Sequence, residues 1–152
     1  MRLNSFDVLN AFAAQLQRSI NSEAFKTKVV VTPSSISEAG VVIKVSLLKT
    51  FIPALPPAAR SARTVRLRVS VCGRAESMTG LQQAVMAIEA VDSYLMSPNI
   101  RLESENVEGI PNSRITQTVS EEDSFFDDPG KTAVQYVQDD RIVIITFPQG
   151  GD

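Results

Sequence analysis

Residues 64–96 read TVRLRVSVCGRAESMTGLQQAVMAIEAVDSYLM and contain the change of pattern that decides the fold. The first part alternates Val65, Leu67, Val69 and Val71 with polar or charged residues. This alternation predicts a strand with one buried face, because successive side chains of a strand point to opposite faces. Apolar residues then recur at steps of three and four, the spacing of one helix face, at Leu81, Ala84, Val85, Ile88, Val91 and Leu95. The pattern predicts a half-buried strand that leads into an amphipathic helix.

Both ends of this helix carry recognisable signals. Thr79 and Gln82 have the spacing of a capping box, and Ser77 is a competing cap. Pro98 predicts the other end, because the residue before a proline disfavours helical geometry.

A second apolar stripe predicts a helix near the amino terminus. Asn4 or Ser5 is its expected cap, and Asp7 lies in the first turn, where a negative charge suits the helix dipole. The stripe consists of Phe6, Leu9, Phe12, Ala13, Leu16 and Ile20. We expect it to pack on the sheet, since amphipathic helices usually face their own core.

Alternation and β-branched content predict further strands at residues 28–32, 41–48, 99–105, 114–119, 132–138 and 141–147. Asp139 and Asp140 are expected to form a two-residue hairpin turn between the last two strands. The last strand is apolar on both faces, which predicts a central position with cover on both sides. We therefore expect a single α+β domain over residues 1–152. It should contain a mixed, mainly antiparallel sheet, with an N-terminal helix and a central amphipathic helix packed against it.

Composition excludes several functions. The chain has 152 residues, no histidine, one cysteine and a formal net charge of −2. The missing histidine removes Ser-His-Asp and Cys-His sites, and a zinc site of the usual N/S type cannot form. No glycine-rich phosphate loop is present, no secretory signal is expected, and no run approaches the length of a membrane span. We expect a soluble, non-enzymatic protein that needs no metal or cofactor.

A proline-rich segment, residues 50–63, does not have the pattern of a core element. It holds three prolines and separates two predicted strands, and loops of this length are usually functional or disordered. Every charge from Lys49 to Arg74 is positive. No aromatic residues are interleaved with these arginines, which argues against nucleic acid as the partner. A solvated arm and an interaction arm both fit this segment.

An acidic loop is predicted at residues 120–131. It contains Glu121, Glu122, Asp123, Asp127 and Asp128 around Phe125 and Phe126, without the spacing of an EF-hand. A polar surface loop is the simplest interpretation. If the phenylalanines are exposed, however, they have the character of a protein-binding anchor rimmed by charge.

The order of elements over residues 4–147 resembles the tail terminator (tail-tube completion) proteins of long-tailed bacteriophages and related prophage elements. The resemblance lies in the strand TVRLRVSVCG, the helix LQQAVMAIEAVDSYL, the acidic loop SEEDSFFDDPG and the terminal strand RIVIITF. It implies a structural virion protein that forms a ring, expected to be hexameric, on the end of the tail tube. The implied partners are further copies of the chain, the tail tube protein and the head–tail connector protein. No membrane and no sequence-specific nucleic acid are expected, and the implied location is the virion tail, after assembly in the host cytoplasm.

A ring uses heterologous contacts, in which one surface of a subunit meets a different surface of the next. We expect the basic segment of one subunit to meet the acidic segment of its neighbour, with Phe125 or Phe126 as the apolar anchor. The predicted interface residues are Phe51, Ile52, Leu55, Arg60, Arg63, Arg66, Arg68, Glu121, Glu122, Asp123, Phe125, Phe126, Asp127 and Asp128.

Two other functions remain open at this point. The chain would be a small adaptor if the proline-rich arm binds a partner of a stable monomer. It would be a metal-dependent enzyme if the carboxylates of the acidic loop hold a cation, and a ligand of this kind would raise the stability of the folded state.

Overall fold

A computed structural model describes residues 4–20, 27–31, 40–52, 62–96, 114–119, 122–127 and 135–148, with the backbone alone for 114–119 and 148. These residues form two helices and six strands: α1 (Ser5–Ile20), β1 (Val29–Val31), β2 (Val41–Phe51), β3 (Ala62–Ala75), α2 (Met78–Leu95), β4 (Arg114–Val119), β5 (Phe125–Asp127) and β6 (Gln135–Pro148). The strands make one sheet in the order β1-β2-β3-β6-β4, and β5 also pairs with β6. The predicted α+β class is confirmed.

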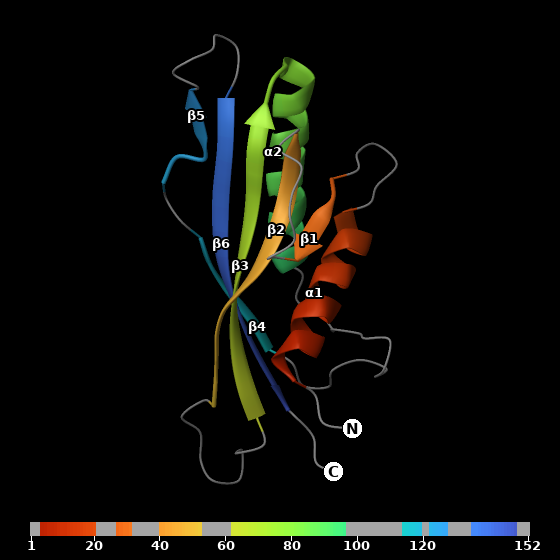
Figure 1. Cartoon of the computed structure of the whole chain (residues 1–152), viewed down its shortest axis with the longest axis vertical. Coiled ribbons are helices and arrows are strands. Elements are labelled where there is room, and N and C mark those ends of the chain that lie inside the picture. The colour runs from red at the N-terminus through yellow and green to blue at the C-terminus, as the bar shows by residue number, and fades with distance from the viewer. Residues whose placement is uncertain are drawn as a thin grey trace.

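The sheet is mixed but mainly antiparallel. β1 pairs with β2 in parallel, and all other described pairs are antiparallel. The three long strands β2, β3 and β6 run along the molecule, and both helices lie on one side of them (Figure 1). The opposite face of the sheet is not covered by either of these helices.

The core lies between the sheet and the two helices. As the alternation predicted, Val65, Leu67, Val69 and Val71 of β3 are almost fully buried. They form one core cluster with neighbouring residues of the sheet and with the helices, among them Leu9, Phe12, Leu16, Ile43, Val45, Val91, Val143, Ile145 and Phe147. Removing this apolar area from water is the main contribution to stability.

Helix α1 starts at a reciprocal cap. The Asp7 amide donates to Asn4 Oδ1 at 2.9 Å, and the Asn4 amide donates to Asp7 Oδ2 at 3.0 Å. Gln17 ties this helix to the start of β1, because its Nε2 donates to the Thr27 carbonyl and its Oε1 accepts from the Val29 amide. Phe6 was assigned to the buried stripe and is instead 59% exposed, because the buried face is centred on Val8, Leu9, Phe12 and Leu16.

Helix α2 is capped by Ser77, whose Oγ accepts from the Gly80 amide, rather than by Thr79. Its buried stripe differs from the predicted one by a rotation of the helix. Ala84, Ala87, Val91, Tyr94 and Leu95 are buried, Leu81 and Ile88 are partly buried, and Val85 is 38% exposed. In this orientation α2 packs on both the sheet and α1, and the rings of Phe12 and Tyr94 lie 5.9 Å apart.

The proline-rich loop is shorter than predicted, because strand pairing continues into both of its ends. Phe51 pairs with Thr64 at the end of β2, while Ala62 and Arg63 pair with β6. Residues 50–51 and 62–63 have amide hydrogens available for the ladder, whereas the prolines begin at Pro53. Residues 53–61 lie outside the described part of the chain.

The predicted turn at Asp139–Asp140 is wrong. β6 continues without interruption from Gln135 to Pro148, and Asp139 and Asp140 pair with Val71 and Ser70 of β3. Neither aspartate is followed by the glycine that a tight hairpin turn prefers, and the buried charge of Asp139 has a partner in Arg141. The central position of residues 141–147 is confirmed, with buried Val143, Ile145 and Phe147 on the helix side. Ile142 and Ile144 on the other side are only partly buried, and no described helix covers them.

The acidic loop is also interrupted by a strand. Phe125–Asp127 forms β5, which pairs with residues 135–137 of β6. The predicted strand at residues 114–119 is confirmed as β4, whereas the one predicted at residues 99–105 lies outside the described residues.

Candidate functional site

The sheet face opposite α1 and α2, here called the open face, carries the basic residues of β2 and β3. Its side chains alternate with the buried ones, so strand register decides which of them lie side by side. One row joins Lys49, Arg66 and Ile144, and the next joins Ser46, Arg68 and Ile142. Arg66 and Arg68 are exposed. A basic and partly apolar strip therefore crosses the middle of the open face.

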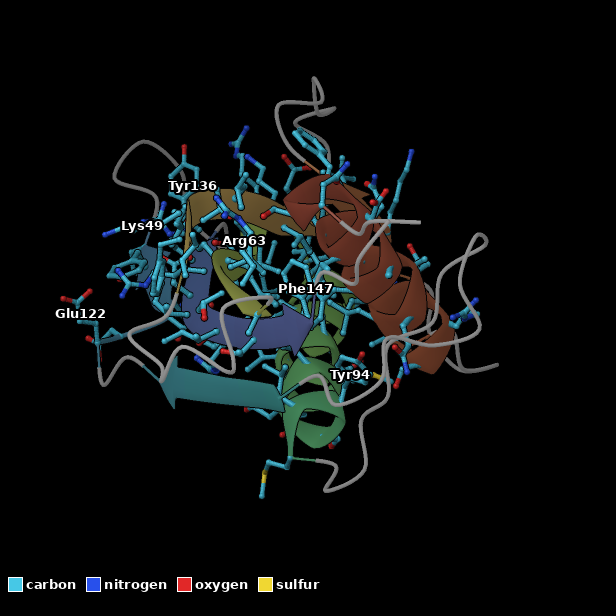
Figure 2. All side chains as sticks on the ribbon, turned by 90° about the horizontal axis from the view of Figure 1, so that it is seen from below. Lys49, Arg63, Tyr94, Glu122, Tyr136 and Phe147 are labelled. Atoms are coloured by element: carbon cyan, nitrogen blue, oxygen red, sulfur yellow. The ribbon has the colours of Figure 1, made fainter. Side chains whose placement is uncertain are left out.

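Each end of the open face has a cation over an aromatic ring. At one end, Lys49 Nζ lies 5.3 Å from the centre of the Phe51 ring. At the other end, the Arg74 guanidinium carbon lies 5.8 Å from the centre of the Tyr136 ring, and Glu76 lies 3.8 Å from Arg74. Lys49 and Tyr136 lie on the same side of the sheet, away from both helices, whereas Phe147 and Tyr94 lie on the helix side (Figure 2).

Asp140 is the one carboxylate that register places among the described side chains on this face. Ser70 Oγ donates to Asp140 Oδ1, and Gln138 Nε2 donates to the same oxygen at 2.7 Å. Cys72 lies in the adjacent row and is buried. Burial raises the pKa of the Cys72 thiol, so the neutral thiol is the stable form.

The acidic edge, residues 122–127, lies beside one end of β6. Glu122, Asp123 and Asp127 are exposed, and Gln135 Nε2 lies 3.5 Å from Asp127 Oδ1. Phe125 packs against the core, whereas Phe126 is 45% exposed. Of the two phenylalanines predicted as an anchor, only Phe126 is placed to contact another molecule.

A buried charge cluster lies under α2 and connects it to the sheet. The Arg141 guanidinium is 2.9 Å from Asp139 Oδ2 and 3.0 Å from Asp92 Oδ1. Ser124 Oγ donates to Asp139 Oδ1 at 2.7 Å, so the segment before β5 joins the same cluster. Burial alone would lower the pKa of Arg141, but the hydrogen bonds and charges of Asp92 and Asp139 raise it. The arginine stays charged, and the cluster is structural.

Among the described side chains, no group of three or more histidine, cysteine or carboxylate residues could hold a metal ion. Glu122, Asp123 and Asp127 do not converge into such a group, and Glu121 and Asp128 lie outside the described residues. No helix in the described part of the chain is long and apolar enough to cross a membrane.

The predicted interface residues do not lie together: besides those at the acidic edge, they occupy both faces of the sheet. Arg66, Arg68 and Phe51 lie on the open face, with exposed Ile52 directly after β2. Arg63 lies on the other face, where its Nε donates to Thr50 Oγ1 at 2.8 Å, and Thr50 Oγ1 is 2.6 Å from Ser5 Oγ. Leu55 and Arg60 lie outside the described residues. The basic segment is therefore divided between both faces of the sheet.

Sequence reasoning included Phe51 among the interface residues but missed Tyr136, the aromatic residue at the other end of the open face. Tyr136 is distant in sequence from the arginines and joins them only through the pairing of β3 with β6. The Asp139–Arg141 pair was also missed, although a signal for it exists. Residues 137, 139, 141, 143, 145 and 147 form one uninterrupted alternating face, in which two opposite charges occupy the middle.

Comparisons with known proteins give no family to which the chain can be assigned. It matches no protein-family model, and no curated protein matches it significantly.

Proposed function

We propose that the chain is a structural subunit of a bacteriophage or prophage tail, located in the virion after assembly in the host cytoplasm. Its copies form a ring, expected to be a hexamer, that caps the tail tube, ends tube growth and offers a surface for the head–tail connector. The proposal rests on the resemblance in element order and on the arrangement of charged surfaces along the sheet.

The observation that carries the proposal concerns the acidic edge and the hairpin end, by which we mean the end of β2 and the beginning of β3 around Arg63. These two surfaces lie at opposite ends of β3 and β6. β5 pairs with residues 135–137, which lie beside residues 73–75 of β3. Arg63, next to the proline-rich loop, pairs with Phe147 at the other end of β6. The two ends point in opposite directions along the longest axis of the molecule (Figure 1).

Two unlike surfaces at opposite ends suit a heterologous contact, which forms a ring when its rotation closes. In this contact the acidic edge of one subunit, with Phe126 at its centre, meets the hairpin end of the next. An exposed aromatic residue rimmed by charge has the composition of an interface hot spot. The surrounding charges contribute register and association rate more than affinity.

The test is the solution mass by light scattering over a wide concentration range, with and without Mg²⁺, combined with negative-stain images of each fraction. Closed rings of uniform size are expected, in a proportion that rises with protein concentration. A monomer under every condition would overturn self-assembly into a ring and would favour the adaptor function instead.

A further inference from the structure

The open face combines two features that the sequence keeps apart. Arg66 and Arg68 come from β3, whereas Tyr136 comes from β6 and Phe51 from the end of β2. Strand pairing places Phe51 at one end of this face and Tyr136, with exposed Phe126 paired beside it, at the other, and the middle carries the exposed arginines. Exposed arginines between aromatic rings are the composition of a surface on which bases stack and phosphates are neutralised.

We propose that the open face binds single-stranded nucleic acid without base specificity. Arg66 and Arg68 contact phosphates, and exposed Tyr136 offers its ring to a base. Lys49 and the partly buried Phe51 beneath it extend the site to the other end of the face. The proposal does not depend on ring formation, because all of these residues belong to one subunit.

The spacing of the cations fits an extended phosphate backbone. Arg66 and Arg68 lie on the same face of β3, and alternate residues of a strand are about 7 Å apart. From Thr64, beside Phe51, to Arg74, beside Tyr136, the strand extends about 33 Å. An extended strand of several nucleotides covers this length, within the range of about 4–16 nucleotides that a small binding domain occupies.

The charge on this face is opposite in sign to that of the whole chain. The protein has a net charge of −2, yet the described open-face side chains include Lys44, Lys49, Arg66 and Arg68 against Asp140. Ser70 and Gln138 already donate hydrogen bonds to Asp140. Binding of a polyanion is therefore expected to be local to this face and strongly dependent on salt.

An acidic protein surface is the competing occupant, and the aromatic rings favour nucleic acid over it. Tyr136 is 42% exposed even though Arg74 lies over its ring. A ring accessible at the end of a row of cations matches the stacking of a base, and stacking is tolerant of sequence because every base has a π face. An acidic protein surface would be complementary to the cations alone and would leave the exposed ring without a role.

The experiment measures fluorescence anisotropy of a labelled oligo(dT) of about 15 nucleotides, an oligo(U) of the same length and a matched duplex, over a series of salt concentrations. Both single strands are expected to bind at low salt, and the duplex is expected to bind more weakly. Arg66→Ala and Arg68→Ala should each weaken binding and reduce the slope of log K against log salt by about one. Arg18→Ala is the matched control, because Arg18 is an exposed arginine on α1, on the helix side of the sheet.

Substitutions of Tyr136 provide a second test, because they would not affect binding if the surface acted through charge alone. Tyr136→Ala should weaken binding roughly tenfold, whereas Tyr136→Phe should retain most of the affinity. The chain has two tyrosines and no tryptophan, so in the Tyr94→Phe background the intrinsic fluorescence reports Tyr136 alone. Saturation with oligo(dT) should quench this fluorescence.

Four results would overturn the proposal. The first is that neither single strand binds at low salt, and the second is that the Arg18 and Arg66 variants weaken binding equally. The third is that Tyr136→Ala binds with the affinity of the wild type. The fourth is that Arg66→Ala loses self-association while the wild type binds no nucleic acid. The last result would assign the open face to a subunit contact. Circular dichroism and denaturant unfolding of each variant separate loss of binding from loss of fold.

Discussion

Arg141 and Asp139 lie two residues apart on the same buried face of β6, with Arg141 Nη1 2.9 Å from Asp139 Oδ2. Both side chains are largely buried, and Asp92 of α2 holds the other side of the guanidinium. The buried face of β6, which is otherwise apolar at Val137, Val143, Ile145 and Phe147, thus contains an ion pair. Ser124 completes the cluster, so one arginine links α2, β6 and the segment before β5.

Breaking this pair from one side should be costly. Arg141→Met leaves the buried Asp139 without its cation, and the free energy of unfolding should fall by about 3–5 kcal/mol. Asp92→Asn should have a smaller effect, because the Asp92 side chain is partly exposed and solvent screens its charge. The double variant Asp139→Leu/Arg141→Met should recover much of the loss, since apolar residues can replace a buried ion pair. Urea unfolding monitored by circular dichroism measures the free energy of unfolding of all three variants. A loss below about 1 kcal/mol in Arg141→Met would contradict the structural role of the ion pair.

Gly73 should tolerate substitution less well than Gly40, which directly precedes Val41, the residue of β2 paired with Gly73. Gly73 has φ +137°, and an added Cβ would lie 2.2 Å from the Gly40 carbonyl oxygen. Gly40 has φ +88°, with no atom within 4 Å of an added Cβ. Gly73→Ala therefore combines backbone strain, worth about 1–3 kcal/mol, with a clash between strands, whereas Gly40→Ala has the strain alone. Equal losses of unfolding free energy in the two variants would show that β2 moves to accommodate the new methyl group.

Stability should fall at alkaline pH. Burial raises the pKa of Tyr94 above its ordinary value of 10.0 and that of Cys72 above 9.0. Above these ordinary values the unfolded chain loses protons that the folded chain still holds, so the free energy of unfolding decreases as pH rises. The contribution of each group is fully present below its ordinary pKa. Urea midpoints at about pH 7 and about pH 10.5 measure the decrease.

Two variants assign this decrease to residues. Tyr94→Phe should reduce the loss above about pH 10, and Cys72→Ala the loss that begins near pH 9. At neutral pH Tyr94→Phe should be close to neutral, because the Tyr94 hydroxyl has no hydrogen-bond partner among the described residues and the contact with Phe12 is kept. An unchanged pH profile in both variants would assign the alkaline loss to other groups.

Charge reversal at the hairpin end should prevent assembly. Arg60→Glu/Arg63→Glu places acids where the acidic edge of a neighbour is expected, and like charges at an interface are strongly unfavourable. The single variant Thr50→Val is the control for Arg63, because it removes both hydrogen bonds of the Thr50 hydroxyl, to Arg63 and to Ser5, while keeping the charge of Arg63. Light scattering should show loss of the ring in the double variant and its retention in Thr50→Val. Assembly that is unchanged by both reversals would rule out this contact.

Phe126 should be needed for assembly but not for folding. Phe126→Ser removes an exposed ring at the acidic edge, whereas Phe6→Ser removes an even more exposed ring from α1 as the matched control. An interface anchor typically contributes at least about 2 kcal/mol, which corresponds to a roughly 30-fold loss in affinity. The assembled fraction at a fixed concentration should fall for Phe126→Ser only. Equal behaviour of the two variants would remove Phe126 from the interface.

The local pattern was enough to predict the α+β class, both helices and the buried face of β3. Val65, Leu67, Val69 and Val71 alternate in the sequence and are buried together in the structure, because a period of two places side chains on one face whatever the neighbouring strand. Helix α2 was predicted with nearly correct ends, but its rotation about its own axis depends on packing against α1 and the sheet, as in the contact of Tyr94 with Phe12. The apolar stripe of a helix sequence does not determine which of its residues are most deeply buried, because several rotations of the helix about its axis bury part of the stripe.

Pairing between strands decided what local pattern could not. In the sequence Asp139 has the character of a turn residue. In the structure it pairs with Val71 and contacts Arg141, and it therefore belongs to a strand. Phe51, Arg66 and Tyr136 come from separate parts of the chain, and only the register of β2, β3 and β6 brings them onto one face. The sequence by itself determined which side of its own strand each residue occupies. The tertiary structure alone determined its neighbours, because register is set by the packing of the whole sheet against α1 and α2.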